Sequence, residues 1–119
     1  MRLLFEASAP LRANAAEARA VIDGDWMLDA LLPGDARSHV EVDRRPGTVG
    51  VQGHWWYRGE VSVVETAAGT WLVQRVFNIA RRGAWAVPLA NRFFIGFREQ
   101  LQHGTEDLAR RMEAHLGSG

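Results

Sequence analysis

The feature that most constrains the fold is a change in the spacing of the apolar residues after about residue 80. Between residues 36 and 80, apolar side chains recur mostly at every second position, which is typical of half-buried strands. From Pro88 to Leu116 they recur every three or four positions, which is typical of one face of a helix. Strands followed by one long helix indicate an α+β fold in which the helix covers a face of an antiparallel sheet.

A further strand is predicted at the start of the chain. Residues 2–9 alternate between apolar and polar side chains, with Leu3, Phe5 and Ala7 on the face that we expect to be buried. Pro10 lacks a backbone N–H and is expected to stop the strand. This strand would join the sheet formed by the later ones.

Two short helices are predicted next. Asn14 stands three residues before Glu17, the spacing of a capping box, so a helix is expected from residue 15 to about 23. Gly24 ends it, and a second helix follows until Pro33. Together they form a bent brace over residues 14–32.

Four strands are expected between the brace and the long helix, over residues 36–44, 48–53, 54–66 and 70–80. Gly59 predicts a bulge or sharp bend in the third of these, which leaves open which face of residues 54–66 points inward. The long helix is predicted from about residue 88 to 116, and a kink or break at Gly104 stays open.

Composition limits the classes of function. The 119 residues fit one domain, which we place at 1–116, followed by a flexible tail at 117–119. Without cysteine, the chain has no disulfide, thiolate nucleophile or cysteine-ligated metal. Fourteen arginines balance 14 acidic residues, so net charge gives no attraction to nucleic acid. No segment reaches the roughly 18 apolar residues needed to span a membrane, and the early Glu6 does not suit a signal peptide, so a cytoplasmic protein is expected.

The histidines give no indication of a metal or cofactor. They stand at 39, 54, 103 and 115, without the spacing that would place two ligands on one helix face. Motifs for phosphate loops, dinucleotides and serine nucleophiles are also missing. The sequence therefore predicts no metal and no cofactor, and it assigns no catalytic residue.

The order of these elements resembles the helix-grip fold of the START/Bet v 1-like (SRPBCC) superfamily, particularly its bacterial polyketide cyclase/dehydrase-like branch. The resemblance covers essentially the whole chain and is carried by Leu3–Ala7 with Pro10, the brace 14–32, the strands 54–66 and 70–80, and the stretch Gly104–Glu113. The family usually has seven strands, whereas this chain has room for about five. A shortened sheet would leave a smaller or more open cavity, and an exposed edge for self-association.

This resemblance implies a curved sheet gripping the C-terminal helix, with an apolar cavity between them for lipids, polyketides, steroids or quinones. The expected function is therefore binding of a small hydrophobic ligand, acidic and aromatic ligands included. Two alternatives stay open: a polyketide cyclase or aromatase, and a protein-interaction or homodimerisation module with a filled core. Aromatic side chains such as Trp56, Trp85 and Phe94, if exposed as a patch, would favour the last.

Eight residues are the candidates for lining the cavity, either as ligand contacts or simply as core: Trp26, Trp55, Tyr57, Trp71, Arg75, Phe77, Phe93 and Phe97. Alternation places Arg75 on the same face as Trp71 and Phe77, where a guanidinium needs a partner. That partner could be Glu60, Asp107 or an anionic group of a ligand. His54 and Glu60 share a strand face but stand roughly 20 Å apart, so they cannot act on one atom together.

Overall fold

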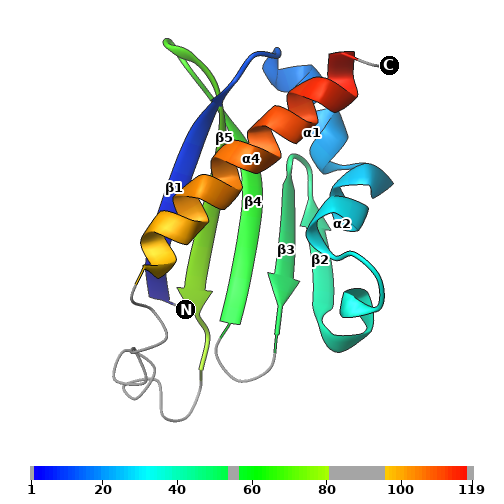
Figure 1. The fold of residues 1–119 in the computed structure, drawn as a ribbon, viewed down its shortest axis with the longest axis vertical. Helices are drawn as coiled ribbons and strands as arrows, with labels where there is room; N and C mark the ends of the chain where they lie inside the picture. Colours follow the sequence, from blue (N-terminus) through cyan, green and yellow to red (C-terminus); the bar gives the residue numbers. More distant parts are fainter. Residues whose placement is uncertain (1, 54–56, 81–95, 118–119) are drawn as a thin grey trace.

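The computed structural model describes residues 2–53, 57–80 and 96–117. The strands are β1 (Arg2–Leu11), β2 (Glu41–Arg45), β3 (Thr48–Gln52), β4 (Tyr57–Thr66) and β5 (Gly69–Asn78). The helices are α1 (Ala15–Ile22), α2 (Asp25–Leu31), the 3-10 turn η1 (Ala36–His39) and α4 (Phe97–Gly117). All strand pairs are antiparallel, in the order β1-β5-β4-β3-β2 (Figure 1). The predicted α+β class, the five-stranded sheet and the long C-terminal helix are confirmed.

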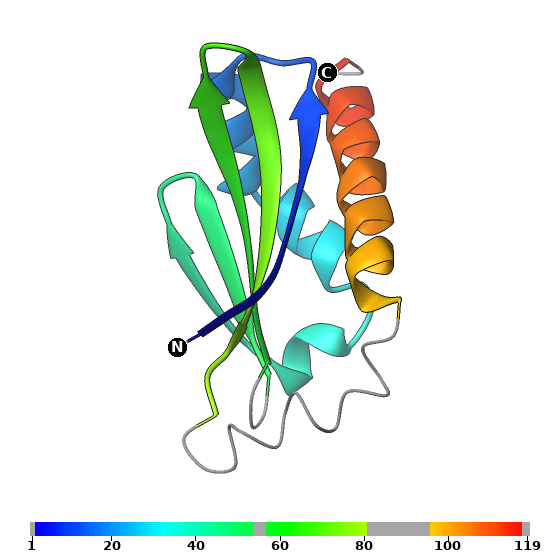
Figure 2. The ribbon, with the colours of Figure 1, turned by 90° about the vertical axis from the view of Figure 1, so that its left-hand side faces the viewer.

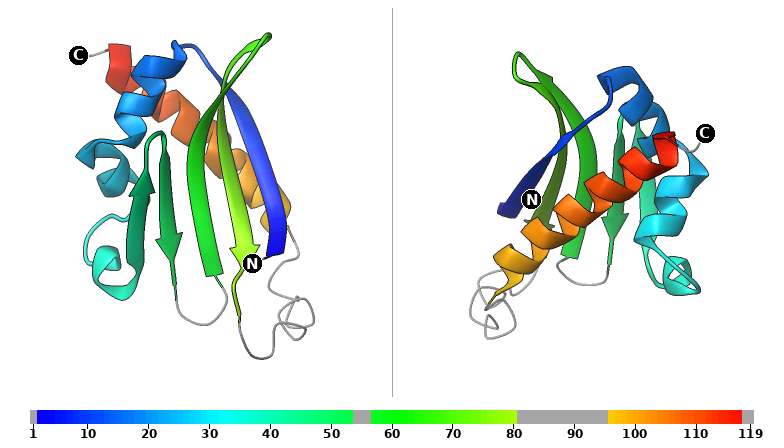
Figure 3. Two further views of the ribbon diagram at one scale, coloured as in Figure 1. Left: turned by 180° about the vertical axis from the view of Figure 1, so that it is seen from behind. Right: turned by 45° about the horizontal axis from the view of Figure 1, so that its top comes forward.

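The described helices all lie on one side of the sheet, which we call the inner face; the opposite side is the outer face (Figure 2). Helix α4 crosses the sheet diagonally over β1 and β5, and α1 packs against β3 and β4 (Figure 1). Seen from behind, the outer face is not covered by any described helix or strand (Figure 3). The layout is that of a helix gripped by a curved sheet.

The core fills the space between the inner face and the helices. Strand residues Leu72, Val61 and Val63 meet Leu108 and Met112 of α4 there. Leu101, Leu108, Met112 and Leu116 belong to the apolar stripe predicted from the sequence, and Thr105 occupies the remaining position on that face. The brace contributes Ala18, Val21, Ile22 and Met27 to the same core.

Strand β1 differs from the prediction at both ends. Its pairing with β5 shifts register between Leu3 and Phe5, so Leu4 is an extra residue. This bulge turns Leu3 to the outer face with 47% of its surface exposed, whereas we predicted it on the buried face. Pro10 does not stop the strand, because β1 is at an edge and has a neighbour on one side only.

Two predictions about the middle strands were wrong. Residues 36–39 form the 3-10 turn η1, and β2 begins only at Glu41. Gly59 makes no bulge, because its pairing continues regularly with Val51 on one side and Val76 on the other. An added Cβ at Gly59 would lie 2.6 Å from the Tyr57 hydroxyl oxygen, so the glycine makes room for the Tyr57 side chain.

The helices begin and end close to where the sequence predicted, except at the start of α4. Asn14 caps α1 as predicted, since its Oδ1 accepts a hydrogen bond from the Glu17 N–H at 2.8 Å. Helix α4 runs unbroken through Gly104. It begins at Phe97, later than predicted, because Gly96 has a φ of 79°, a left-handed conformation that cannot continue a helix. The part of the prediction over residues 88–95 lies outside the described residues.

Candidate functional site

A pocket of about 220 Å³ opens on the inner face, between β3–β5, the end of α2 and the first turns of α4. Its walls are mainly the apolar side chains of Leu31, Leu32, Val40, Val51, Val61, Val76 and Leu101. Alternation explains the sheet side of this wall, since Val61 and Gln74 are directly paired and share the inner face. The pocket is the place where an apolar ligand could contact both sheet and helix.

Tyr57 contributes a hydroxyl to this pocket. It lies at the start of β4 on the inner face, and its ring extends over Gly59. Burial raises the pKa of the Tyr57 phenol above its usual value of 10.0, because the charged form would lose solvation. The phenol therefore stays neutral at physiological pH and can both donate and accept hydrogen bonds.

Gln74 contributes an amide, which is held in place by α4. The hydroxyl of the fully buried Thr105 lies 2.7 Å from Gln74 Oε1 and 2.7 Å from the Leu101 carbonyl oxygen. A hydroxyl has one proton, so the two acceptors compete for it. The Gln74 amide group thus keeps hydrogen-bonding capacity on the pocket wall.

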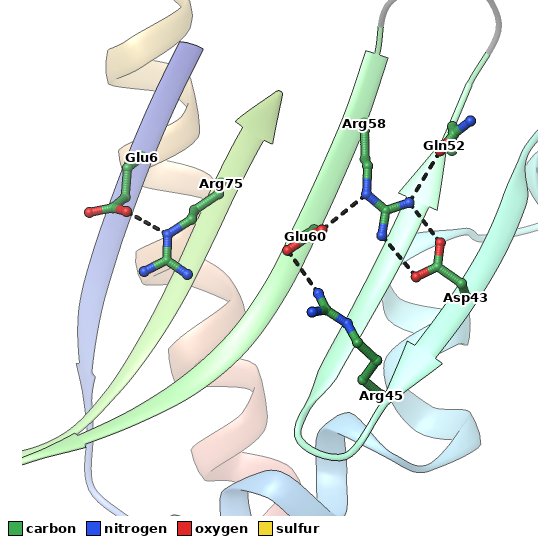
Figure 4. A network of polar contacts seen from close by, with 7 residues as sticks. All are labelled: Glu6, Asp43, Arg45, Gln52, Arg58, Glu60 and Arg75. Atoms are coloured by element: carbon green, nitrogen blue, oxygen red, sulfur yellow. Dashed lines mark hydrogen bonds and ion pairs between the residues drawn. The ribbon is translucent and has the colours of Figure 1, made fainter. Parts of the chain in front are cut away.

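The outer face has a different chemistry, a row of charges that crosses the sheet. The strand registers place Glu6, Arg75, Glu60, Gly50 and Asp43 directly side by side on β1, β5, β4, β3 and β2. We call these five positions the charge row. At Gly50 an added Cβ would overlap the Arg58 guanidinium, which shows that Arg58 occupies the missing position of the row (Figure 4). The signs therefore alternate across all five strands.

Arg58 is the centre of the row. Its Nη1 and Nη2 donate to the two oxygens of Asp43 at 2.6 and 2.8 Å, and its Nε donates to Glu60 at 3.0 Å (Figure 4). Arg45 donates to the other Glu60 oxygen at 3.2 Å. The hydrogen bond with Arg58 lowers the pKa of Asp43, and the same bond raises the pKa of Arg58. Only 11% of the Arg58 side chain and 12% of the Glu60 side chain are exposed.

Arg75 lies next in the row, on the outer face. Its Nε donates to Glu6 at 2.5 Å, and 35% of its side chain is exposed. We expected a structural partner at Glu60 or Asp107, but Glu6 takes that role. Glu60 is the neighbour on β4 and accepts from Arg58 and Arg45 instead, and Asp107 belongs to α4 on the inner side. Arg75 is among the residues that line the pocket, but its pairing with Glu6 on the outer face gives no support to an anionic ligand there.

The other predicted ligand residues do not converge on the pocket. Trp71 and Phe77 share the face of Arg75, as predicted, but that face is turned away from α4. Trp26 stacks on His115 at 4.8 Å between ring centroids, with the Arg111 guanidinium 5.9 Å from its ring. Phe97 packs against Phe5 at 5.0 Å. Of the described candidates, Tyr57 and Arg75 are among the residues that line the pocket. The Tyr57 side chain lies on the inner face, whereas the Arg75 guanidinium pairs with Glu6 on the outer face.

Several expectations concern residues that the structure does not describe. The candidates Trp55 and Phe93 lie outside the described residues, as do His54 and the proposed patch of Trp56, Trp85 and Phe94.

Gln74, and Val40 directly after η1, are pocket residues that the sequence did not predict. The signal for Gln74 was the hairpin at Ala67 and Ala68: a two-residue turn pairs Thr66 with Gly69 and therefore Val61 with Gln74. That pairing would have shown that Gln74, and not Arg75, shares the face of the apolar β4 residues.

The described residues contain no group of three or more histidine or acidic side chains that could hold a metal ion. None of the described helices has the length and hydropathy needed to cross a lipid bilayer.

Comparison with known proteins gives no further assignment: no family model matches the chain, and neither the curated proteins nor the solved structures include a significant match.

Proposed function

We propose that the protein binds a small, neutral and mainly apolar molecule in the pocket between the sheet and α4. The observation that carries the proposal is the combination of apolar walls with two neutral polar groups, the Tyr57 hydroxyl and the Gln74 amide. Ligand sites in proteins are typically apolar with a few polar groups that fix orientation. A fully apolar gap would give no such orientation.

The volume limits the size of the ligand. An apolar cavity of about 150 Å³ holds one benzene ring, so a pocket of about 220 Å³ fits a molecule of one or two rings. Ligand sites for larger molecules start at about 300 Å³. We therefore propose an aromatic or quinone-like compound with one hydroxyl or carbonyl group, and not a steroid or a long lipid.

Binding is preferred here over cyclase chemistry. Cyclisation of a polyketide would need a group that removes a proton near neutral pH. Glu60 and Arg75 also line the pocket, but their charged groups are held in ion pairs with Arg58 and Glu6 on the outer face. Tyr57 is the titratable residue whose side chain lies on the inner face, and its raised pKa makes it a poor base at that pH. The resemblance to cyclase-like proteins thus supports the pocket but supplies no base in it.

The test is a titration of the protein with four probes, followed by NMR of the backbone amides and by calorimetry. Naphthalene, indole and 2-naphthol match the proposed size, and dodecanoate is too long and is charged. We expect 2-naphthol to bind most tightly, naphthalene more weakly, and dodecanoate not at all. Shifts should concentrate at β4, β5 and the first turns of α4.

Two variants of α4 provide a matched pair for this test. Leu101→Trp would fill the pocket, whereas Leu116→Trp makes the same change at a half-buried leucine that does not line it. We expect Leu101→Trp to abolish 2-naphthol binding and Leu116→Trp to leave it intact. Equal binding by both variants, or no binding of any ring compound to the wild type, would overturn the proposal.

A further inference from the structure

The outer face has several apolar residues that no described helix or strand covers. An antiparallel sheet with helices on one side normally presents polar side chains on the other. Here β5 turns the half-buried Trp71 and Phe77 and the buried Val73 outward, and the exposed Leu3 is paired beside Phe77. Apolar residues gathered on a sheet face are typical of a protein interface.

The charge row gives this face a pattern that is complementary to itself. Reading across the sheet, the charges are Glu6, Arg75, Glu60, Arg58 and Asp43, and so they alternate in sign (Figure 4). Because the whole chain has a formal net charge of zero, two copies do not repel each other by net charge. Whether two copies attract each other through this face depends on how their charge rows are aligned.

Two-fold symmetry restricts that alignment. An axis along a strand would set Glu60 against Glu60 or Arg75 against Arg75. An axis parallel to the strands but between β4 and β5 sets Arg75 of each copy against Glu60 of the other, and Glu6 against Arg58. The same axis brings Trp71 over Val64 of the other copy, because these two residues are paired across β4 and β5.

The sheet edges are less suitable for self-association. On the β1 edge, the Ser8 carbonyl oxygen accepts from Gln102 at 2.8 Å, the Arg12 N–H donates to Glu113 at 3.2 Å, and Pro10 has no N–H to donate. The β2 edge is five residues long and mostly charged, which disfavours pairing with another strand. The edges therefore offer a second copy fewer free backbone groups and apolar side chains than the outer face does.

We propose that the outer face binds a second copy of this chain about a two-fold axis parallel to the strands and between β4 and β5. With this axis the two copies overlap over the ten residues each of β4 and β5 and where the five residues of β3 face β1. Strand spacing of about 4.8 Å and a rise of about 3.4 Å per residue then give roughly 490 Å² of sheet per copy, which is in the range of weak, reversible dimers. This inference does not depend on the ligand proposed above.

The test uses an exchange of charges between β1 and β5. The double variant Glu6→Arg with Arg75→Glu preserves the net charge and the pair between β1 and β5. Across the proposed interface, however, the exchange sets the new carboxylate at position 75 against Glu60, and the new guanidinium at position 6 against Arg58. The control Asp107→Arg with Arg110→Glu exchanges an exposed pair on α4, away from the outer face.

Sedimentation velocity over about 10 to 300 μM protein, a range suited to micromolar dissociation constants, provides the measurement. We expect the wild type and the α4 control to form dimers, and the β1–β5 exchange to stay monomeric. The exchange variant should keep a cooperative urea transition with a lowered midpoint, because the new carboxylate at position 75 also lies beside Glu60 of its own sheet. Salt at about 0.5 M should shift the wild type toward monomer, since it screens exposed charges. A wild type that is monomeric throughout, or an exchange variant that dimerises like the wild type, would overturn the inference.

Discussion

The two faces of β4 and β5 are made by alternate residues of the same strands, yet they differ in almost every physical respect. The inner residues Val61 and Leu72 are buried in the core that α4 completes, and the pocket on this side has mainly apolar walls. The outer residues Glu60 and Arg75 belong to a row of charges that no described element covers. One strand can therefore contribute to the core with one face and to a charged surface with the other. Residues of either face can be substituted without altering the other face.

The largest difference between the faces should be in burial. Leu72→Ala removes a fully buried side chain from the core, and we expect it to lower the free energy of unfolding by about 3 kcal/mol. Leu3→Ala makes the same change at the exposed outer position and should cost at most about 0.5 kcal/mol. Urea unfolding monitored by tryptophan fluorescence measures both. Similar losses for the two variants would contradict the assignment of the faces.

Within the charge row, the loss of stability on removing an arginine should depend on how deeply its charge is buried. Arg58→Met leaves the carboxylates of Asp43 and Glu60 without their shared partner, and we expect a loss of about 2–3 kcal/mol. Arg75→Met breaks a more exposed pair and should cost below about 1 kcal/mol. The same urea experiment decides this. A larger loss of stability for Arg75→Met than for Arg58→Met would contradict the stronger contribution that we assign to the more buried ion pairs of Arg58.

Gly50 tests the close packing of the outer face, and Gly104 in α4 serves as its control. Gly50→Ala adds a Cβ that would overlap the Arg58 guanidinium and lie 2.8 Å from Asp43 Oδ1, so we expect it to destabilise the fold by about 1 kcal/mol. Gly104→Ala adds a Cβ with no atom within 4 Å in the middle of α4, and it should stabilise by up to about 1 kcal/mol. Opposite signs in thermal unfolding are the expected result; stabilisation by both changes would place Arg58 elsewhere.

The sequence predicted the class of fold and which residues of a strand lie on the same face of the sheet. It did not predict which of the two faces packs against the helix. Alternation correctly grouped Trp71, Arg75 and Phe77, because side chains in a strand repeat every two residues. It could not show that this more apolar group points away from α4. The pairing of Val61 with Gln74 settles that question, and it depends on hairpin register, which alternation within one strand does not contain.

The pocket was predictable only in its general position. Tyr57 was recognised from its place on β4. Val40 was not, because it follows the turn η1, and the alternation over residues 36–44 had predicted a strand there. Gly59 was predicted as a bulge or bend, and Gly96 was not predicted as a helix boundary, since a glycine is compatible with a bend, a helix end or space for a neighbour. Their roles follow from φ at Gly96 and from the position of Tyr57 over Gly59, both of which are tertiary properties.

The smallest expected effect is a difference in titration between the faces. On the outer face, the hydrogen bond from Arg58 lowers the pKa of Asp43 below 3.8. A lowered pKa in the folded state stabilises it above that value, and this contribution is lost as the pH falls through the folded pKa. On the inner face, burial raises the pKa of Tyr57 above 10.0, so its contribution is present below pH 10.0 and is lost as the pH rises through the folded pKa.

Both shifts can be measured at single residues. The chain has one tyrosine, so absorbance near 295 nm reports Tyr57 alone, and carbon-detected NMR reports the Asp43 carboxyl. We expect Arg58→Met to return the Asp43 pKa toward 3.8 while leaving the Tyr57 pKa raised, because the two causes lie on opposite faces of β4. If that variant also returned the Tyr57 pKa to 10.0 in a protein that is still folded, the two faces would be coupled and not independent.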